Sequence, residues 1–504
     1  MRRITVVVAV AVAGSALAAA LAATAPAPQA NPDPEAEARA DGCGRDYFAQ
    51  TRREIPTWVF VGDRDAPATG PAPAPRRLEG RIASRYDPDF AVHPTEEDLP
   101  TIHRGYDFNF DVLPDPAYAG LLAGNPGTTT GNFAGRSAST ARLHVEREEH
   151  ALPRFAWPEV GDRVTLVGSW VWDCGHWTPG GEKTELHSYR ALWLERNAGR
   201  ASPYSRSGES EGDLFLSSDK TFAGVQADCA HRAKGVSAVF MACLASAPAW
   251  QDLSGNYSFR LRVPPRPRRG SRLVVRVVDA GSSAGAPRAK AVVRGKGVDV
   301  SLNVAATRGR PLVVAQRVLA RWTGAAEPVH LRVRFLRLLV RRAMDPGCPR
   351  SNPKCPSRQT TRGEQDSRSP GEWNVYVNAA GVWKTWGKGL LRVRDGQVFQ
   401  RGPVLDVHLL RGRPWRIFAF ARECDFGSLG NADGAAHAMA PCPRSTEIGS
   451  FEGDDSAGVA VLRLRSPAAA LGTHRLRPRR RGSTCPAVNR LGCYELLVRV
   501  LRVR

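Results

Sequence analysis

The sequence predicts a mainly β protein: an OB-like or irregular β domain followed by an antiparallel β-sandwich domain of the C2-like or Ig-like kind, with few short helices. Three observations support this prediction. Apolar residues alternate with polar ones or form short continuous runs, and they do not recur every three to four residues. The 48 glycines and 38 prolines fall largely between these segments. In the second half the segments recur at roughly ten to fifteen residues, a spacing typical of a sandwich.

Segments with the strand pattern follow one another through most of the chain. They are residues 58–61, 142–148, 163–172, 184–194, 257–263, 272–278, 311–322, 330–340, 373–378, 404–410, 415–420, 459–464 and 495–503. Short helices are expected only around residues 229–234.

Composition divides the chain into successive regions. The predicted order is a signal peptide at 1–25, a disordered segment at 26–42, a first β-rich domain at 43–263, a linker at 264–270 and a β-sandwich domain at 271–504. Two Pro-rich stretches interrupt these domains, a linker-like one at 65–77 and a long Cys- and Pro-rich loop at 345–371.

The N-terminus has the pattern of a secretory signal peptide. Two arginines follow Met1, and the chain is then mostly apolar from Ile4 to Ala23. The sequence therefore predicts a protein that is secreted or held at the cell surface. The apolar stretch is also nearly long enough to span a bilayer, so an uncleaved N-terminal anchor is the alternative. No transmembrane segment is expected in the mature chain.

All ten cysteines are expected to be oxidised, because an even number in an exported chain usually forms disulfides. Four pairs lie close together in sequence: Cys229 with Cys243, Cys348 with Cys355, Cys424 with Cys442, and Cys485 with Cys493. Cys43 and Cys174 remain for a fifth bridge. The sequence does not determine the connectivity, and the alternative is that some thiols stay reduced and buried.

The chain is strongly basic, with 71 Lys and Arg against 49 Asp and Glu and a net charge of +22. Such a charge suits an anionic partner, such as an anionic cell-surface polymer. Arginine dominates, however, and a GC-rich coding sequence produces the same bias without any selection for binding. The densest run, residues 475–481, has no interleaved aromatic residues, which argues against nucleic acid.

A strand, a turn and a second strand carry four groups suited to metal binding. The first strand ends in Asp173, the turn carries His176, and the return strand reads Thr-Glu-Leu-His up to His187. Side chains alternate along a strand, so Glu185 and His187 share one face. Convergence of Asp173, His176, Glu185 and His187 would suit Zn²⁺ or another divalent ion, with a water in an open position activated for hydrolysis.

Upstream, His144 and Glu146 repeat the same spacing on another strand. Glu146 is therefore the candidate base of a metal-dependent hydrolase built on this hairpin. The alternative is a structural polar network, in which the Glu and His hydrogen-bond to Tyr189 or Arg190. Metal analysis distinguishes these alternatives.

The hairpin resembles that of a group of exported bacterial proteins with a Gly-x-Trp-Val-x-Asp-x-Gly-His turn and a following Thr-Glu-Ile-His-Pro strand. The resemblance covers roughly residues 100–260. Leu186 and Ser188 stand where the group has Ile and Pro, and neither change removes a candidate ligand. The activity of that group is unassigned, so the resemblance implies no function. Segments of this kind also look like parts of OB-like barrels, which is an analogy of fold alone.

Acidic residues in the second half give a weaker candidate for Ca²⁺, because oxygen-rich loops at one end of a sandwich can hold this ion. They are Asp345, Glu372, Glu452, Asp454 and Asp455. Acidic loops are also commonly just solvated.

Two further leads concern a serine and the aromatic residues. Ser210 lies in a Gly-x-Ser-x-Gly pattern, but its neighbours lack the buried strand and helix that a nucleophile elbow needs. Tryptophans cluster at the hairpin and in the second half, where exposed rings would bind carbohydrate and buried rings would form core. The clustered aromatic residues are Trp170, Trp172, Trp177, Trp373, Tyr376, Trp383 and Trp386.

The sequence as a whole favours an exported binding or cell-surface protein without catalytic activity, with an unidentified ligand. The first alternative is the divalent-metal-dependent hydrolase, and the second is binding of carbohydrate or an anionic polymer. No P-loop, dinucleotide fingerprint, Cys-x-x-Cys or His-Glu-x-x-His occurs, which excludes the commonest nucleotide, redox and zinc-protease sites. Enzymatic activity itself is left open.

Overall fold

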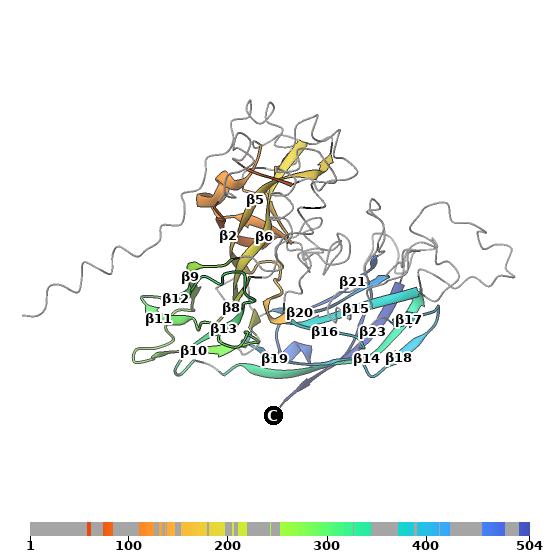
Figure 1. Ribbon diagram of the computed structural model, residues 1–504. Helices are drawn as coiled ribbons and strands as arrows, with labels where there is room; N and C mark the ends of the chain where they lie inside the picture. The colour runs from red at the N-terminus through yellow and green to blue at the C-terminus, as the bar shows by residue number, and fades with distance from the viewer. Residues whose placement is uncertain are drawn as a thin grey trace, which may run out of the picture.

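The computed structural model confirms a mainly β protein. It describes residues 58–61, 74–83, 110–124, 131–133, 137, 139–146, 153–178, 181–196, 204–205, 210–218, 242, 252–325, 327–343, 371–387, 391–412, 414–423, 456–478 and 493–503. Apart from β7, which pairs with β19, the strands up to β13 lie on one side in Figure 1 and those from β14 onward lie on the other. Among the described residues, no helix has the length and apolar character needed to span a membrane.

The first body is a closed barrel. Its strands are β2 (Arg76–Ala83), β3 (Phe110–Pro114), β4 (Leu143–Glu146), β5 (Arg163–Thr178) and β6 (Gly181–Arg196), with β1 (Trp58–Phe60) added beside β5. They follow the order β2-β3-β4-β6-β5, and β5 pairs back onto β2 to close the sheet. All of these pairs are antiparallel except β4 with β6. A small closed barrel of this kind matches the predicted OB-like domain.

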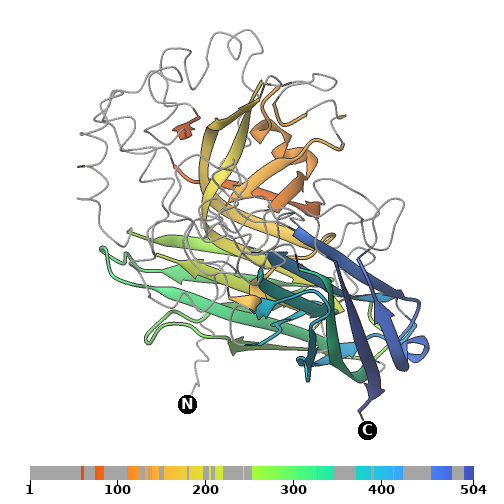
Figure 2. The ribbon, with the colours of Figure 1, turned by 90° about the vertical axis from the view of Figure 1, so that its right-hand side faces the viewer.

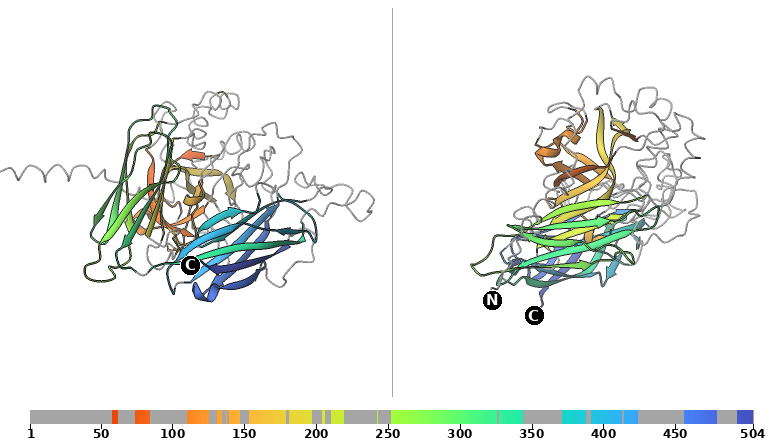
Figure 3. Two further views of the ribbon diagram at one scale, coloured as in Figure 1. Left: turned by 90° about the horizontal axis from the view of Figure 1, so that it is seen from below. Right: turned by 60° about the vertical axis from the view of Figure 1, so that its left-hand side comes forward.

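A second pair of sheets continues from the barrel. The end of β6 pairs with β8 (Ser210–Ser217), which is followed in the sheet by β13 (Val313–Trp322) and β10 (Leu273–Asp279). A three-stranded sheet made of β11 (Lys290–Arg294), β12 (Gly297–Val304) and β9 (Gly255–Arg262) shares its apolar core, which includes Trp193 and Phe259. The left panel of Figure 3 shows the two green layers side by side.

The C-terminal part is a two-sheet sandwich with a core of its own. One sheet contains β22 (Gly472–Leu476), β23 (Cys493–Arg502), β14 (Val329–Arg342), β19 (Val404–Leu409), β18 (Val398–Gln400) and β7 (Tyr204–Ser205). The other contains β16 (Val382–Thr385), β15 (Gly371–Ala379), β20 (Trp415–Glu423), β21 (Ser456–Leu464) and β17 (Leu391–Val393). The Tyr494 hydroxyl joins the sheets by donating to the carbonyls of Ala419 and Gly458, at 2.8 and 2.9 Å.

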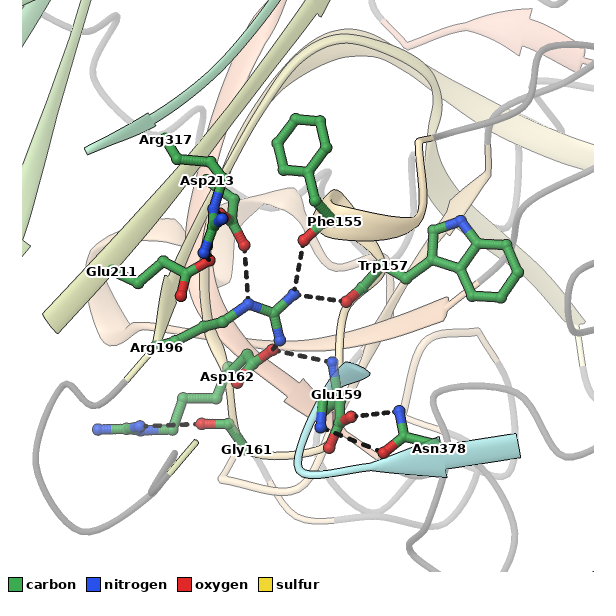
Figure 4. Close-up of polar contacts among 12 residues, drawn as sticks. Phe155, Trp157, Glu159, Gly161, Asp162, Arg196, Glu211, Asp213, Arg317 and Asn378 are labelled. Atoms are coloured by element: carbon green, nitrogen blue, oxygen red, sulfur yellow. Dashed lines mark hydrogen bonds and ion pairs between the residues drawn. The ribbon is translucent and has the colours of Figure 1, made fainter. Parts of the chain in front are cut away.

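A buried arginine organises the base of the barrel (Figure 4). Arg196 is 1% exposed and donates to Asp213 at 2.8 Å, to Asp162 at 3.1 Å and to the carbonyls of Phe155 and Trp157. Burial acts to lower the pKa of Arg196, but the charges of Asp162 and Asp213 outweigh it and raise that pKa. The guanidinium therefore stays charged, with its charge balanced inside the fold.

The same region attaches the barrel to the sandwich. Glu159 accepts from Asn378 of β15 at 2.8 Å and from Arg416 of β20 at 3.2 Å. Trp157 packs edge-on against Trp383, with ring centroids 5.2 Å apart. Figure 2 shows the orange and yellow barrel strands above, with the green and blue strands beneath them. Polar and aromatic contacts thus join the two bodies in one structure.

The expected linker at 264–270 lies between β9 and β10. Strands on both sides of it share the core that contains Trp193, and the sheets of the C-terminal sandwich take up the chain from β14 onward. The predicted strands at 163–172, 257–263 and 311–322 correspond to β5, β9 and β13. Residues 1–25, 26–42, 229–234 and most of 345–371 lie outside the described residues.

Candidate metal centre

The parallel pair β4–β6 turns ionisable side chains to the outside of the barrel wall. Leu143 and Val145 of β4 and Leu186 of β6 belong to the apolar core. Because side chains alternate along a strand, their neighbours face the other way. These neighbours are His144, Glu146, Glu185 and His187, which we call the His-Glu cluster. The register places His144 beside Glu185 and Glu146 beside His187.

This outer face is buried, although its sequence pattern is that of a solvated one. His144 is 6% exposed, Glu146 1%, and Glu185 and His187 are both 0% exposed. Burying ionisable groups is costly unless they are paired or bind a metal. The His-Glu cluster therefore requires either internal pairing or a ligand.

Three of the four side chains converge on one point, and His187 contacts two of these three. One ligand atom from each of His144, Glu146 and Glu185 lies within 4.8 Å of the others. Oε2 of Glu146 is 3.6 Å from His144 Nε2 and 3.7 Å from His187 Nδ1, and the latter is 2.8 Å from Glu185 Oε1. Ligands with bonds near 2 Å around a tetrahedral ion lie about 3.3 Å apart. Three of the separations, 2.8, 3.6 and 3.7 Å, bracket that value, so small side-chain movements would suffice to bind an ion.

Asp111 of β3 orients the first imidazole. Its Oδ1 is 3.1 Å from His144 Nδ1. A carboxylate only accepts, so Nδ1 donates to Asp111, and Nε2 faces Oε2 of Glu146 at 3.6 Å. A carboxylate behind a histidine in this way is the usual second support of a metal ligand.

Three carboxylates lie in or beside the His-Glu cluster. Those of Glu146 and Glu185 lie next to the imidazoles, and that of Asp111 is 3.8 Å from the guanidinium of Arg142. Oε2 of Glu185 is buried and accepts no hydrogen bond from any described residue. A buried carboxylate oxygen of this kind has the lone pairs that a divalent cation would bind.

The sequence predicts four metal ligands in this hairpin, and the structure describes the side chains of two of them. Glu185 and His187 lie together, and Glu146, predicted as a base, lies in the same cluster. Asp173 and His176 are on β5, but their side chains lie outside the described residues, so their part in the site stays a prediction. His144 was not named as a ligand. In the sequence, the only indication is that His144 and Glu146 have the same spacing as Glu185 and His187. The parallel pairing of β4 with β6 places His144 next to Glu185.

The remaining predicted site residues are mostly outside the described part. Asp345, Glu452, Asp454, Asp455 and the side chain of Glu372 fall there, so the Ca²⁺ site stays a prediction. Cys493 is buried and disulfide-bonded. The other cysteines' side chains are not described, so the pairing of Cys493 with Cys485 is also still a prediction. Ser210 opens β8 as a strand residue, consistent with rejection of the nucleophile elbow.

The described aromatic residues of the two predicted clusters are core. Each is at most 5% exposed: Trp170, Trp373, Tyr376, Trp383 and Trp386. The side chains of Trp172 and Trp177 lie outside the described residues. Stacking of sugars on the five buried rings is therefore excluded, because a sugar needs an exposed ring face.

Comparison with known proteins adds little. No known protein family matches the sequence, and no curated protein does either. Among solved structures, a C2 domain of plant extended synaptotagmin 1 is similar over 36% of this chain and 98% of its own, with 9% identity and a TM-score of 0.19. Human GIVD cytosolic phospholipase A2 is similar over 86% of this chain, which spans 33% of that enzyme, with 9% identity and a TM-score of 0.17. The chain is thus assigned to no family, and its function has to be argued from its own residues.

Proposed function

We propose that this chain is an exported binding protein without catalytic activity, whose barrel binds a divalent ion of the zinc type through the His-Glu cluster. The observation that carries the proposal is the convergence of His144, Glu146 and Glu185 within 4.8 Å in a buried position. Imidazoles together with carboxylates favour Zn²⁺ or another first-row ion over Ca²⁺, which prefers oxygen ligands alone. The signal-peptide pattern and the even number of cysteines support export.

Burial favours a structural ion over a catalytic one. Structural zinc sites are closed, whereas catalytic sites keep a position open for water or substrate. The His-Glu cluster is at most 6% exposed. It also joins β4 to β6, which are separated in sequence by β5. An ion here would stabilise the parallel pair of the barrel and offset the repulsion between buried carboxylates.

Metal analysis of the purified full chain tests the proposal. The wild-type protein is expected to contain about one ion per chain. His144→Gln and Glu146→Gln are expected to lose it, because each removes a ligand. Glu195→Gln is the matched control, since Glu195 is also a buried carboxylate of β6 but pairs with Arg262 at 2.5 Å. A chelator should lower the denaturation temperature of wild type and control, and leave the two ligand variants unchanged.

Two results would overturn the proposal. If the wild-type chain takes up no ion from zinc-containing buffer, the His-Glu cluster is a structural polar network and not a metal site. An ion that supports hydrolysis of a chromogenic ester, with activity lost in Glu146→Gln and kept in Glu195→Gln, would instead establish the hydrolase.

A further inference from the structure

The outer face of the sheet β22-β23-β14-β19 is covered with arginines. Residues paired across antiparallel strands share a face, and the register aligns Arg334 with Arg499 and Arg475 with Leu497 and Arg337. The apolar residues between them, such as Val333 and Val498, point into the sandwich core. The arginines associated with this face are Arg332, Arg334, Arg337, Arg341, Arg475, Arg477 and Arg499. Asp406 and Glu495 are the carboxylates that they contact among the described residues.

Four of these arginines surround one carboxylate, that of Glu495. Arg477 Nε donates to it at 2.7 Å, and nitrogens of Arg475, Arg341 and Arg337 lie 3.1, 3.4 and 3.6 Å from its oxygens. Glu495 is 2% exposed, whereas the side chains of the four arginines are between 34% and 56% exposed. We call this group the arginine cluster. Glu495 holds the guanidiniums in place from below, and they remain accessible from solvent.

The arginine cluster has far more donors than its carboxylate can use. Each guanidinium has five N–H groups, whereas a carboxylate accepts about four hydrogen bonds in all. In the described part of the chain, no other acceptor takes a hydrogen bond from these four side chains. The cluster therefore presents a net positive charge and many free donors, fixed on a rigid sheet.

This arrangement differs from a general arginine bias. A coding bias scatters arginine over the surface, where each side chain can pair with its nearest acid. Arg260 and Asp299 form such a pair on β9 and β12, 2.5 Å apart. Four arginines from two separate parts of the sequence converge on Glu495, with no second acid among the described residues to balance them. The excess of positive charge is therefore a property of the arginine cluster and not of the surface in general.

We propose that this face binds a phosphate-bearing polymer, with the arginine cluster as its main anchor. Guanidinium groups form paired, charge-assisted hydrogen bonds to phosphate oxygens, which suits them to this ligand. Arg334 and Arg499 extend the positive charge along the sheet, so that a chain with successive phosphates could bind more than one position. Leu339, Leu497 and Leu501 on this face are only partly exposed, which leaves little apolar area for insertion into a lipid bilayer.

Binding of inorganic polyphosphate to the full chain tests the proposal, measured by titration calorimetry at low and at high salt. The double variant Arg475→Ser/Arg477→Ser should weaken binding about tenfold or more, because it removes two charge-assisted donors. The control is Arg260→Ser/Arg294→Ser, which makes the same change in net charge at two exposed arginines around Asp299. It should leave the affinity within about twofold.

Three outcomes would overturn the proposal. Equal weakening by both double variants would show that only total charge matters. Binding to vesicles of phosphatidylcholine with phosphatidylglycerol, without binding to polyphosphate, would identify a membrane surface instead. Loss of polyphosphate binding in Glu146→Gln, with the arginine variants unaffected, would place the ligand at the metal centre.

Discussion

The His-Glu cluster and the arginine cluster place buried carboxylates in opposite surroundings. Glu185 and Glu146 lie next to the imidazoles of His144 and His187. Glu495 is buried to a similar degree, yet four guanidiniums surround it. The first two carboxylates therefore have potential metal ligands as neighbours, and the third has cations.

A buried carboxylate thus indicates a ligand only through its neighbours. Where buried carboxylates meet imidazoles, the group has the donor set of a metal ion. Where several guanidiniums share one carboxylate on an accessible face, the group suits an anion. The Arg196 network is the reference case, because its buried carboxylates, Asp162 and Asp213, each form an ion pair with the same guanidinium inside the fold.

The largest expected effect is at this reference network. Arg196→Met should lower the free energy of unfolding by about 3 kcal/mol or more, because it leaves two buried carboxylates without their main cation. Arg260→Met, at an exposed pair, should cost less than about 1 kcal/mol. Urea denaturation measures both. A small loss at Arg196 would contradict this reasoning, since buried charge would then need no partner in this fold.

A smaller effect is expected at the arginine cluster. Glu495→Gln should lower the free energy of unfolding by about 1 kcal/mol at low salt, because it removes the anion that holds four exposed arginines together. Salt should reduce this loss by screening the repulsion. Urea denaturation at two salt concentrations tests this, with Asp299→Asn as an exposed control. A loss that grows with salt would contradict the assignment.

The smallest effect is a pH dependence at the same residue. Burial acts to raise the pKa of Glu495, but the hydrogen bond and charge of Arg477, with Arg475 and Arg341, outweigh it and lower that pKa. The carboxylate therefore stabilises the fold above its unfolded pKa of about 4.3, and this contribution is lost as pH falls through the lower folded value.

Wild type and Glu495→Gln should consequently converge in stability at low pH. Between about pH 5 and pH 3 the difference should shrink by about 0.5 kcal/mol, since only part of the titration falls in that window. Urea midpoints measured along this range provide the test. A difference that widens as the pH falls would mean that the arginines do not stabilise the charged carboxylate.

Much of the fold was predictable because strand patterns are local. The alternation in 257–263 and in 311–322 predicts β9 and β13 without any tertiary information. The strand β2 was partly assigned to a linker, since its apolar residues are few and its sequence follows a Pro-Ala stretch. β11 and β12 were not predicted. Val292 and Val293 of β11 are exposed, so no clear alternation marks that strand.

The site was predictable only in part. Glu185 and His187 share a face because they are two residues apart on one strand, and this spacing is visible in the sequence. His144 joins them through a parallel pairing of strands that are about forty residues apart, which no local pattern specifies. The burial of this polar face was not predictable either, because the same alternation is typical of a strand with one side in water.

By itself, the sequence determined the mainly β class, the signal-peptide pattern, the basic charge and the polar residues that could bind a ligand. Only the tertiary structure decided which of these residues meet. The composition gives only the number of charges, whereas Coulomb interactions depend on distance and on exclusion of water. A net charge of +22 is therefore consistent with an arginine bias of the coding sequence and also with an anion-binding site. The convergence of four arginines on Glu495 favours a site, and the closed barrel that pairs β4 with β6 assembles the candidate metal centre.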